Sequence, residues 1–235
     1  MQRGMNLRKA NRMSACRPLL RIEPMHGNSI APQGVGDGSA GTTRGVASFG
    51  ILYVIGQGQY EQLQRMVFAR EGQCPVFAVL DGAIVDDLPP LLQRHAPDAM
   101  CLFSGDLDPM LAAAAPYLLA LAPDSGGAQL ALRDGWNSHW GIVLVADPGT
   151  QAHALRAHLR RILRVGTPGG ESMLFRFYDP RAFRSVVPSF DAEQRKAFFG
   201  PIRGCYVEGR DGQGVLYFAR DGEAAPRVLP LAAAA

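Results

Sequence analysis

The chain is poor in cysteine and has no arrangement of cysteines typical of a cross-linked or zinc-binding protein. Its four cysteines are scattered and form no CxxC pair: Cys16, Cys74, Cys101 and Cys205. This pattern gives neither a disulfide framework nor a zinc site. Three of them lie next to predicted strands, where a buried free thiol is the usual outcome. A reducing cytoplasm is the simplest setting for such thiols, so we expect a cytoplasmic protein.

Long apolar runs are also missing. The stretch from Met110 to Ala122 is nearly all apolar, but Pro116 interrupts it, and it is shorter than the ~18 residues that a membrane span requires. No apolar segment of the kind found in a secretory signal follows the basic start of the chain. The sequence therefore predicts neither a membrane anchor nor a membrane partner.

Charge is scarce and unevenly placed. Charged residues make up 19% of the chain, and the net charge is +3. Seven basic and two acidic residues within 1–46 give that segment +5, which leaves −2 for residues 47–235. A slightly acidic body without a basic stripe argues against nucleic acid as a partner.

Residues 1–46 have no apolar periodicity and end in a stretch rich in Gly, Ser and Thr. This composition is typical of a flexible segment. We expect 1–46 to be a flexible, arginine-rich tail, either a disordered extension or a mis-assigned start.

Beyond the tail, apolar strand-like runs alternate with helical stretches. Strands are expected over 50–56, 75–82, 99–105, 116–123, 139–147 and 172–180, and the clearest helices over 59–71 and 150–166. Strands apolar on both faces and separated by short helices predict an α/β fold with a mostly buried, mixed or parallel sheet and flanking helices. The rhythm changes near residue 180. We therefore expect an α/β lobe over 47–170 and a smaller, helix-rich C-terminal lobe over 171–235, ending in a hairpin around GRDGQG.

Motifs of catalysis are weak or missing. The GQGQYEQ stretch lacks the Lys-Ser/Thr pair of a P-loop, the serines lie outside GxSxG, and the histidines have no metal-binding spacing. We accordingly assign no catalytic, cofactor or metal residue and expect a protein that is not an enzyme. The alternative is an uncharacterised hydrolase or nucleotide-dependent enzyme that uses aspartates near strand ends, where sites of α/β proteins lie: Asp81, Asp106, Asp108 and Asp147.

The stretch MLFRFYDPRAF, residues 173–183, is the most distinctive part of the sequence. Asp179 followed by Pro180 has the form of a helix start, with aspartate as N-cap and proline at the first helical position. Arg176 lies in an apolar strand-like run, so it needs a partner if buried, and Asp179 or another carboxylate could provide one. Two interpretations remain open: a structural joint between strand and helix, or a polar anchor for a partner.

Seven segments follow one another in this order and spacing: FAVLDGA (77–83), CLFSG (101–105), PYLLAL (116–121), WNSHWGIVL (136–144), LRAHLRRIL (155–163), LFRFYDPR (174–181) and AFFGPIR (197–203). Together they resemble the bacterial type VI secretion effector chaperones, also called effector adaptors and formerly a domain of unknown function.

The resemblance implies a non-catalytic cytoplasmic chaperone that needs no cofactor. It would bind a cognate effector, through the N-terminal segment of that effector, and would help load it onto the spike protein, which it contacts transiently. Aromatic residues and arginine dominate interface hot spots. The candidates for partner binding, or for the joint between the lobes, are Trp136, Trp140, Arg176, Tyr178, Asp179 and Arg181.

Overall fold

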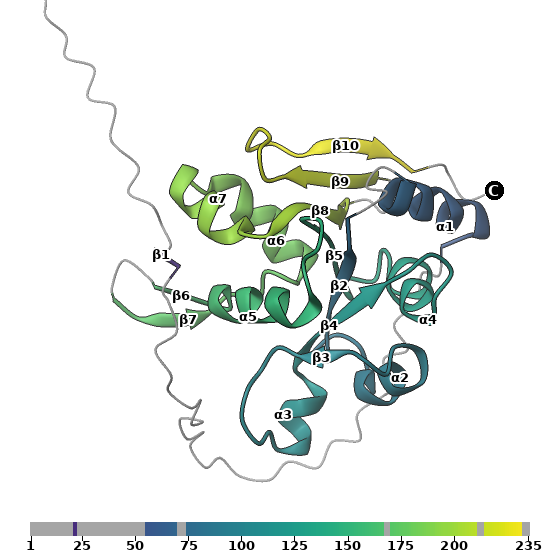
Figure 1. Cartoon of the computed structure of the whole chain (residues 1–235), viewed down its shortest axis with the longest axis horizontal. Coiled ribbons are helices and arrows are strands. Elements are labelled where there is room, and N and C mark those ends of the chain that lie inside the picture. Colours follow the sequence, from purple (N-terminus) through teal and green to yellow (C-terminus); the bar gives the residue numbers. More distant parts are fainter. Residues whose placement is uncertain (1–20, 23–54, 70–73, 167–169, 211–213, 232–235) are drawn as a thin grey trace, which may run out of the picture.

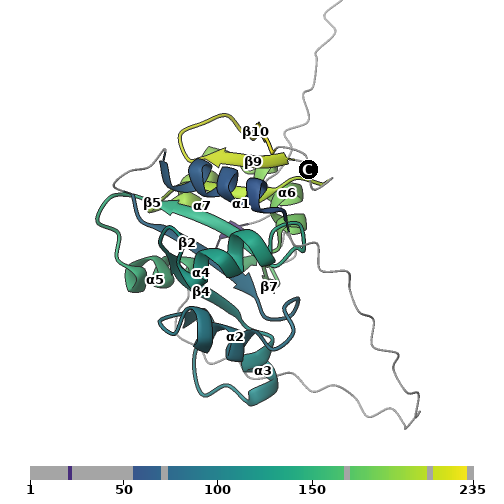
Figure 2. The ribbon, with the colours of Figure 1, turned by 90° about the vertical axis from the view of Figure 1, so that its right-hand side faces the viewer.

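A seven-stranded sheet runs through the centre of the molecule, as Figures 1 and 2 show from two sides. The computed structural model describes residues 21–22, 55–69, 74–166, 170–210 and 214–231. The strand order is β10-β9-β8-β5-β2-β4-β3. These strands are β2 (Val76–Asp81), β3 (Met100–Cys101), β4 (Pro116–Leu121), β5 (Gly141–Ala146), β8 (Ile202–Glu208), β9 (Gly214–Ala219) and β10 (Arg227–Pro230).

Every pair of neighbouring strands in this sheet is antiparallel. The combination of helices and sheet is as expected, but the expectation of a mixed or parallel sheet is wrong. An apolar run indicates that both faces of a strand are buried, and such burial is more common in parallel sheets. Here helices cover both faces of an antiparallel sheet, so the same apolar pattern arises without parallel pairing.

Alternate residues of the strands enter two separate cores. Phe77 and Val79 of β2 belong to one apolar cluster, whereas Val76, Ala78 and Leu80 belong to the other. The first cluster is covered by α5 (Ala152–Ile162), α6 (Pro180–Val186) and α7 (Ala192–Phe199). The second is covered by α1 (Gln57–Gln64), α2 (Leu88–His95) and α4 (Gly126–Ala128) with the π-helical turn Gln129–Asp134 that follows it. The result is three layers, helices on both sides of a sheet.

The remaining helical elements are short. A π-helical turn, Arg65–Ala69, continues α1, while α3 (Pro109–Ala113) precedes β4 and a 3₁₀ turn, Val187–Ser189, follows α6. None of the helices in the described ranges is long and apolar enough to cross a membrane.

The separate C-terminal lobe expected over 171–235 is not confirmed. β8 is hydrogen-bonded to β5, so β8, β9 and β10 extend the main sheet. Phe177, Phe183 and Phe198 pack in the same cluster as Phe77 of β2. The hairpin expected around GRDGQG is confirmed, because β8 and β9 pair antiparallel up to Glu208 and Val215.

A second, three-stranded sheet lies beside the helices α5 and α7 (Figure 1), with the order β1-β6-β7. Its strands are β1 (Arg21–Ile22), β6 (Arg164–Gly166) and β7 (Ser172–Leu174). The helix expected over 150–166 therefore ends early and gives way to β6, and the strand expected over 172–180 ends at Leu174. The expected strand over 50–56 lies outside the described residues except for Ile55 and Gly56, and the expected tail over 1–46 lies outside them except for Arg21 and Ile22.

Candidate functional site

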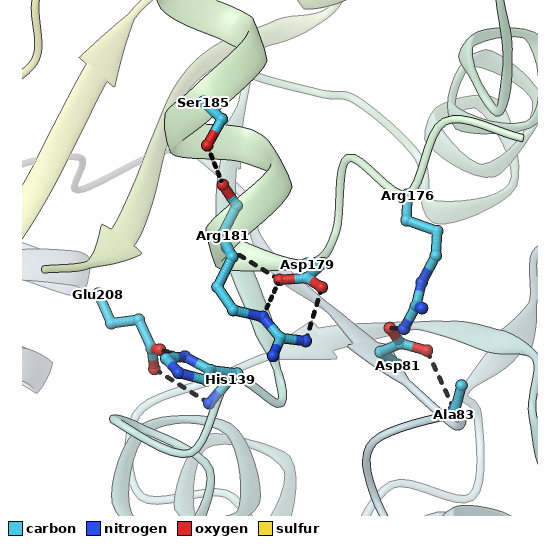
Figure 3. A network of polar contacts seen from close by, with 8 residues as sticks. All are labelled: Asp81, Ala83, His139, Arg176, Asp179, Arg181, Ser185 and Glu208. Atoms are coloured by element: carbon cyan, nitrogen blue, oxygen red, sulfur yellow. Dashed lines mark hydrogen bonds and ion pairs between the residues drawn. The ribbon is translucent and has the colours of Figure 1, made fainter. Parts of the chain in front are cut away.

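Asp81, the last residue of β2, is fully buried and is the anchor of a polar cluster (Figure 3). Its Oδ1 accepts the backbone N–H of Ala83 at 3.0 Å. Its Oδ2 accepts a hydrogen bond from the guanidinium of Arg176, 95 residues further along the chain. Burial acts to lower the pKa of Arg176, but the hydrogen bond and the charge of Asp81 outweigh it and raise that pKa. The pair ties the loop before α6 to the end of a central strand.

Asp179 begins α6, as the sequence predicts. Its Oδ1 accepts the backbone N–H of Arg181 at 2.8 Å, and Pro180 occupies the first turn. The Arg181 side chain also donates from Nε to Oδ1 at 3.0 Å and from Nη2 to Oδ2 at 2.8 Å. Burial acts to raise the pKa of Asp179, yet the bonds from Arg181 lower it overall. Asp179 is therefore committed to the helix start and to Arg181, not to Arg176.

His139 and Glu208 form the third pair of the cluster. Glu208 ends β8 with 2% of its surface exposed, and its carboxylate contacts Nδ1 of His139. Burial raises the pKa of Glu208, although the charge and hydrogen bonds of His139 oppose that rise. His139 lies in the turn WNSHWG, where its φ is +60° and that of Asn137 is +66°. Two left-handed residues within this six-residue turn make it a strained segment, and the buried Glu208 holds it.

These three pairs lie close to one another, and Figure 3 shows them together with α6 above. The charge of Arg176 acts to lower the pKa of Arg181, and the charge of Asp81 acts to raise it. Arg184, one turn further along α6, donates to the backbone carbonyl of Glu208. We call the set Asp81, His139, Arg176, Asp179, Arg181 and Glu208 the polar cluster. It joins β2, β8, α6 and the turn before β5 at one place.

Arg176 and Arg181 are each paired with a carboxylate, and the ring of His139 contacts the carboxylate of Glu208. Among the residues that the structure describes, no group of three or more His, Cys, Asp and Glu side chains is placed to hold a metal ion. Tyr178, next to this cluster, is buried, and burial raises the pKa of its hydroxyl.

Two of the strand-end aspartates are separated because β2 and β5 are antiparallel. Leu80 pairs with Gly141 at the start of β5, whereas Asp147 follows the far end of that strand. Asp81 and Asp147 therefore lie at opposite ends of the sheet. Asp147 is paired with Arg220 at 2.7 Å, and Asp108 caps α3 through the Leu111 N–H. Because Asp81 and Asp147 are separated in this way, the four carboxylates do not all meet in one site.

The predicted candidates fall into two groups by exposure. Trp136 and Tyr178 are 3% and 2% exposed and belong to the cores, so neither offers a surface to a partner in this conformation. Arg176 and Arg181 expose 38% and 51% of their side chains, and Trp140 is half-buried. Glu208 was missed, since a lone glutamate at the end of a strand carries no motif.

A separate surface pocket lies between α1 with its π-helical turn and the loop that follows β4. Its volume is about 450 Å³. It contains none of the predicted candidates and is lined by Glu61, Gln64, Arg65, Phe68, Pro123 and Asp124.

A family model described as a domain of unknown function, DUF4123, matches residues 76–197, just over half of the chain. The chain belongs to the DUF4123 family. This domain is associated with effector adaptors of type VI secretion, in line with the resemblance seen in the sequence. No curated protein and no solved structure matches the chain. The DUF4123 match runs from β2 to α7, so it includes Asp81, Arg176, Asp179 and Arg181, while Glu208 lies beyond it.

Proposed function

We propose that this DUF4123 chain is a non-catalytic adaptor that binds a cognate type VI secretion effector in the cytoplasm and helps load it onto the spike protein. The family match is the observation that carries the proposal. The effector would be bound through its N-terminal segment, and the contact with the spike would be transient.

The described surface is compatible with protein binding. Large apolar side chains are exposed on α3, on β7 and on β10: Met110, Leu111, Met173, Leu174 and Val228. Apolar side chains surrounded by a charge-poor surface are a common property of protein-binding faces. Within the polar cluster, Arg181, Arg176 and His139 expose 51%, 38% and 35% of their side chains, so these members could touch a partner. Arginine is among the residues that most often carry binding energy.

The decisive experiment is a secretion assay in the native bacterium. Deletion of the chain should abolish secretion of one effector, encoded by a neighbouring gene, while the spike and unrelated effectors are still secreted. Purified chain should capture that effector, and an effector without its N-terminal segment should fail to bind. Unchanged secretion of every effector would overturn the proposal.

Two other outcomes point to different classes of protein. Loss of spike secretion together with all effectors would indicate a structural component of the secretion apparatus. A stoichiometric nucleotide or metal in the protein purified from its own host would contradict the non-catalytic part of the proposal.

A further inference from the structure

The outer edge of β6 accepts a strand from a distant part of the chain. β6 has β7 on one side and β1, from the N-terminal tail, on the other. Arg21 pairs with Gly166 and Ile22 with Val165, in antiparallel register. β1 also lies against α7. The three-stranded sheet is therefore completed by a segment more than a hundred residues away in sequence from the strand that it joins.

The accepting edge is anchored without β1. β6 follows directly on α5, and its three residues all pair with β7. Val165 is 1% exposed and belongs to the same core cluster as Phe175 and Leu159. β6 is thus held by the Val165 side chain in the core and by backbone pairing with β7, along the edge away from β1.

The segment that occupies this edge is short. Two paired residues provide few hydrogen bonds, each with a net contribution of about 1 kcal/mol. Strands this short are marginal by themselves. A partner segment that pairs with all three residues of β6 would form more backbone hydrogen bonds than Arg21–Ile22 do. It would therefore bind the edge more tightly than the tail segment does.

Apolar side chains are also exposed on β7, which pairs with β6 on the side away from this edge. On β7, Met173 and Leu174 expose 49% and 46% of their surface, and Met173 pairs with Val165. Residues directly opposite in an antiparallel pair share a face of the sheet. A residue of an added strand opposite Val165 would share the face of a buried side chain, so an apolar residue is favoured at that position.

We propose that the outer edge of β6, Arg164–Gly166, is a strand-acceptor site, and that its partner is an extended segment of the effector with an apolar residue opposite Val165. The tail segment Arg21–Ile22 is an intramolecular competitor that occupies the site until the effector displaces it. Addition of a strand to an exposed edge is a recurrent mode of peptide recognition, in which main-chain hydrogen bonds supply affinity. The identity of the partner rests on the proposed function, whereas the acceptor site does not.

The acceptor site can be tested without an effector. The probe is a fluorescent peptide of residues 17–26, RPLLRIEPMH, added to the full-length chain. In the variant R21P/I22P the tail lacks both N–H donors, so it should leave the edge free. A competitor tethered to the same chain acts at a high effective concentration, so the variant should bind the probe at least about fivefold more tightly than wild type.

Two controls make this measurement specific. The variant S39P/A40P, with two prolines elsewhere in the tail, should bind the probe as weakly as wild type. A probe with prolines in place of Arg21 and Ile22 should not bind any of the chains. Equal affinity of all three chains, or equal binding of the proline probe, would overturn the acceptor site. Thermal melting of R21P/I22P shows whether the variant is folded.

A disulfide lock tests the acceptor site independently, and it links the site to the effector. Directly opposed residues in an antiparallel pair are about 4.5–5.5 Å apart at Cα, a separation that a disulfide can span. The variant I22C/V165C should therefore hold the tail on β6 when oxidised. The oxidised chain should bind the effector at least about tenfold more weakly than the reduced chain, since the competitor can no longer leave. The single variant V165C should show no response to reductant.

The outcomes separate the two proposals. If wild type binds the effector and the oxidised lock binds it equally well, the β6 edge is not the effector site and the adaptor function stands. If no effector binds wild type, the proposed function fails and the effector as occupant fails with it. The peptide result then still decides whether the edge accepts a strand.

Discussion

The ion pair between Asp81 and Arg176 should be a stabilising contact of the fold. Replacement of Arg176 by alanine leaves a fully buried carboxylate that retains the Ala83 N–H at 3.0 Å but loses its cation. Removal of one partner from a fully buried pair costs about 3–5 kcal/mol. Arg176 exposes 38% of its side chain, so water can partly replace it. We expect R176A to lower the free energy of unfolding by about 2–3 kcal/mol.

The pairing itself is measured by a double-mutant cycle with D81N. The amide introduced by D81N keeps an oxygen for the Ala83 N–H but carries no charge, so the further change R176A should cost under about 1 kcal/mol in that background. The coupling energy should then be about 1.5–2 kcal/mol. Urea unfolding followed by circular dichroism at pH 7 measures all four chains.

R181A is the matched control, because Arg181 pairs with Asp179 on the same helix start and exposes 51% of its side chain. Exposed pairs contribute under about 1 kcal/mol. The reasoning is refuted if R176A is as stable as R181A, or if the coupling energy is below about 0.5 kcal/mol. An R176A chain with wild-type stability that no longer captures the effector would instead make Arg176 a partner contact.

Three further predictions concern the helix start, a glycine and a histidine. D179A should lower the unfolding free energy by about 1–2 kcal/mol in urea titrations through loss of the N-cap, whereas D179N should restore most of it. G200A should cost about 3 kcal/mol, because φ is +47° and a Cβ would lie 2.4 Å from Cε1 of His158; a wild-type melting temperature would contradict this. His158 is buried, and burial lowers its pKa below 6.5. The folded state therefore binds its proton less readily than the unfolded state, so stability should fall as the pH drops below 6.5. H158Q should flatten that part of the profile of unfolding free energy against pH, and an unchanged slope would refute the assignment.

Local chemistry was the most predictable part of this chain. Asp179 was expected to cap a helix, and its side chain accepts the backbone N–H of Arg181 at the start of α6. The strands expected over 75–82, 116–123 and 139–147 correspond to β2, β4 and β5. Caps and apolar runs act over a few residues, so a short window of sequence contains all the information that they need.

Strand direction could not be predicted in the same way. Alternate residues of β2 enter different cores, and this two-sided burial is identical whether the neighbouring strands run parallel or antiparallel. The lengths of β3 and β7 were overestimated for a related reason. Apolar residues such as Phe175 and Phe177 fill the core from a loop, and sequence periodicity does not distinguish this from a strand.

The polar cluster could be predicted only in part, because its pairs join residues far apart in sequence. Arg176 was expected to need a carboxylate, and the partner is Asp81 on β2, not the nearby Asp179. His139 and Glu208 are 69 residues apart. Pairs of this kind arise from the order of strands in the sheet, which brings the end of β2 and the end of β8 to either side of β5.

The position of β5 also has a consequence for how the protein folds. β5 lies between β2 and β8, so the centre of the sheet consists of strands from three distant parts of the chain. Contacts between residues far apart in sequence slow folding, because long loops must close before any contact stabilises them. During synthesis β2, β4 and β5 leave the ribosome well before β8, and until then β5 has one free apolar edge. We therefore expect slow folding and aggregation of chains that stop short of β8, while chains that include β8 and β9 remain soluble.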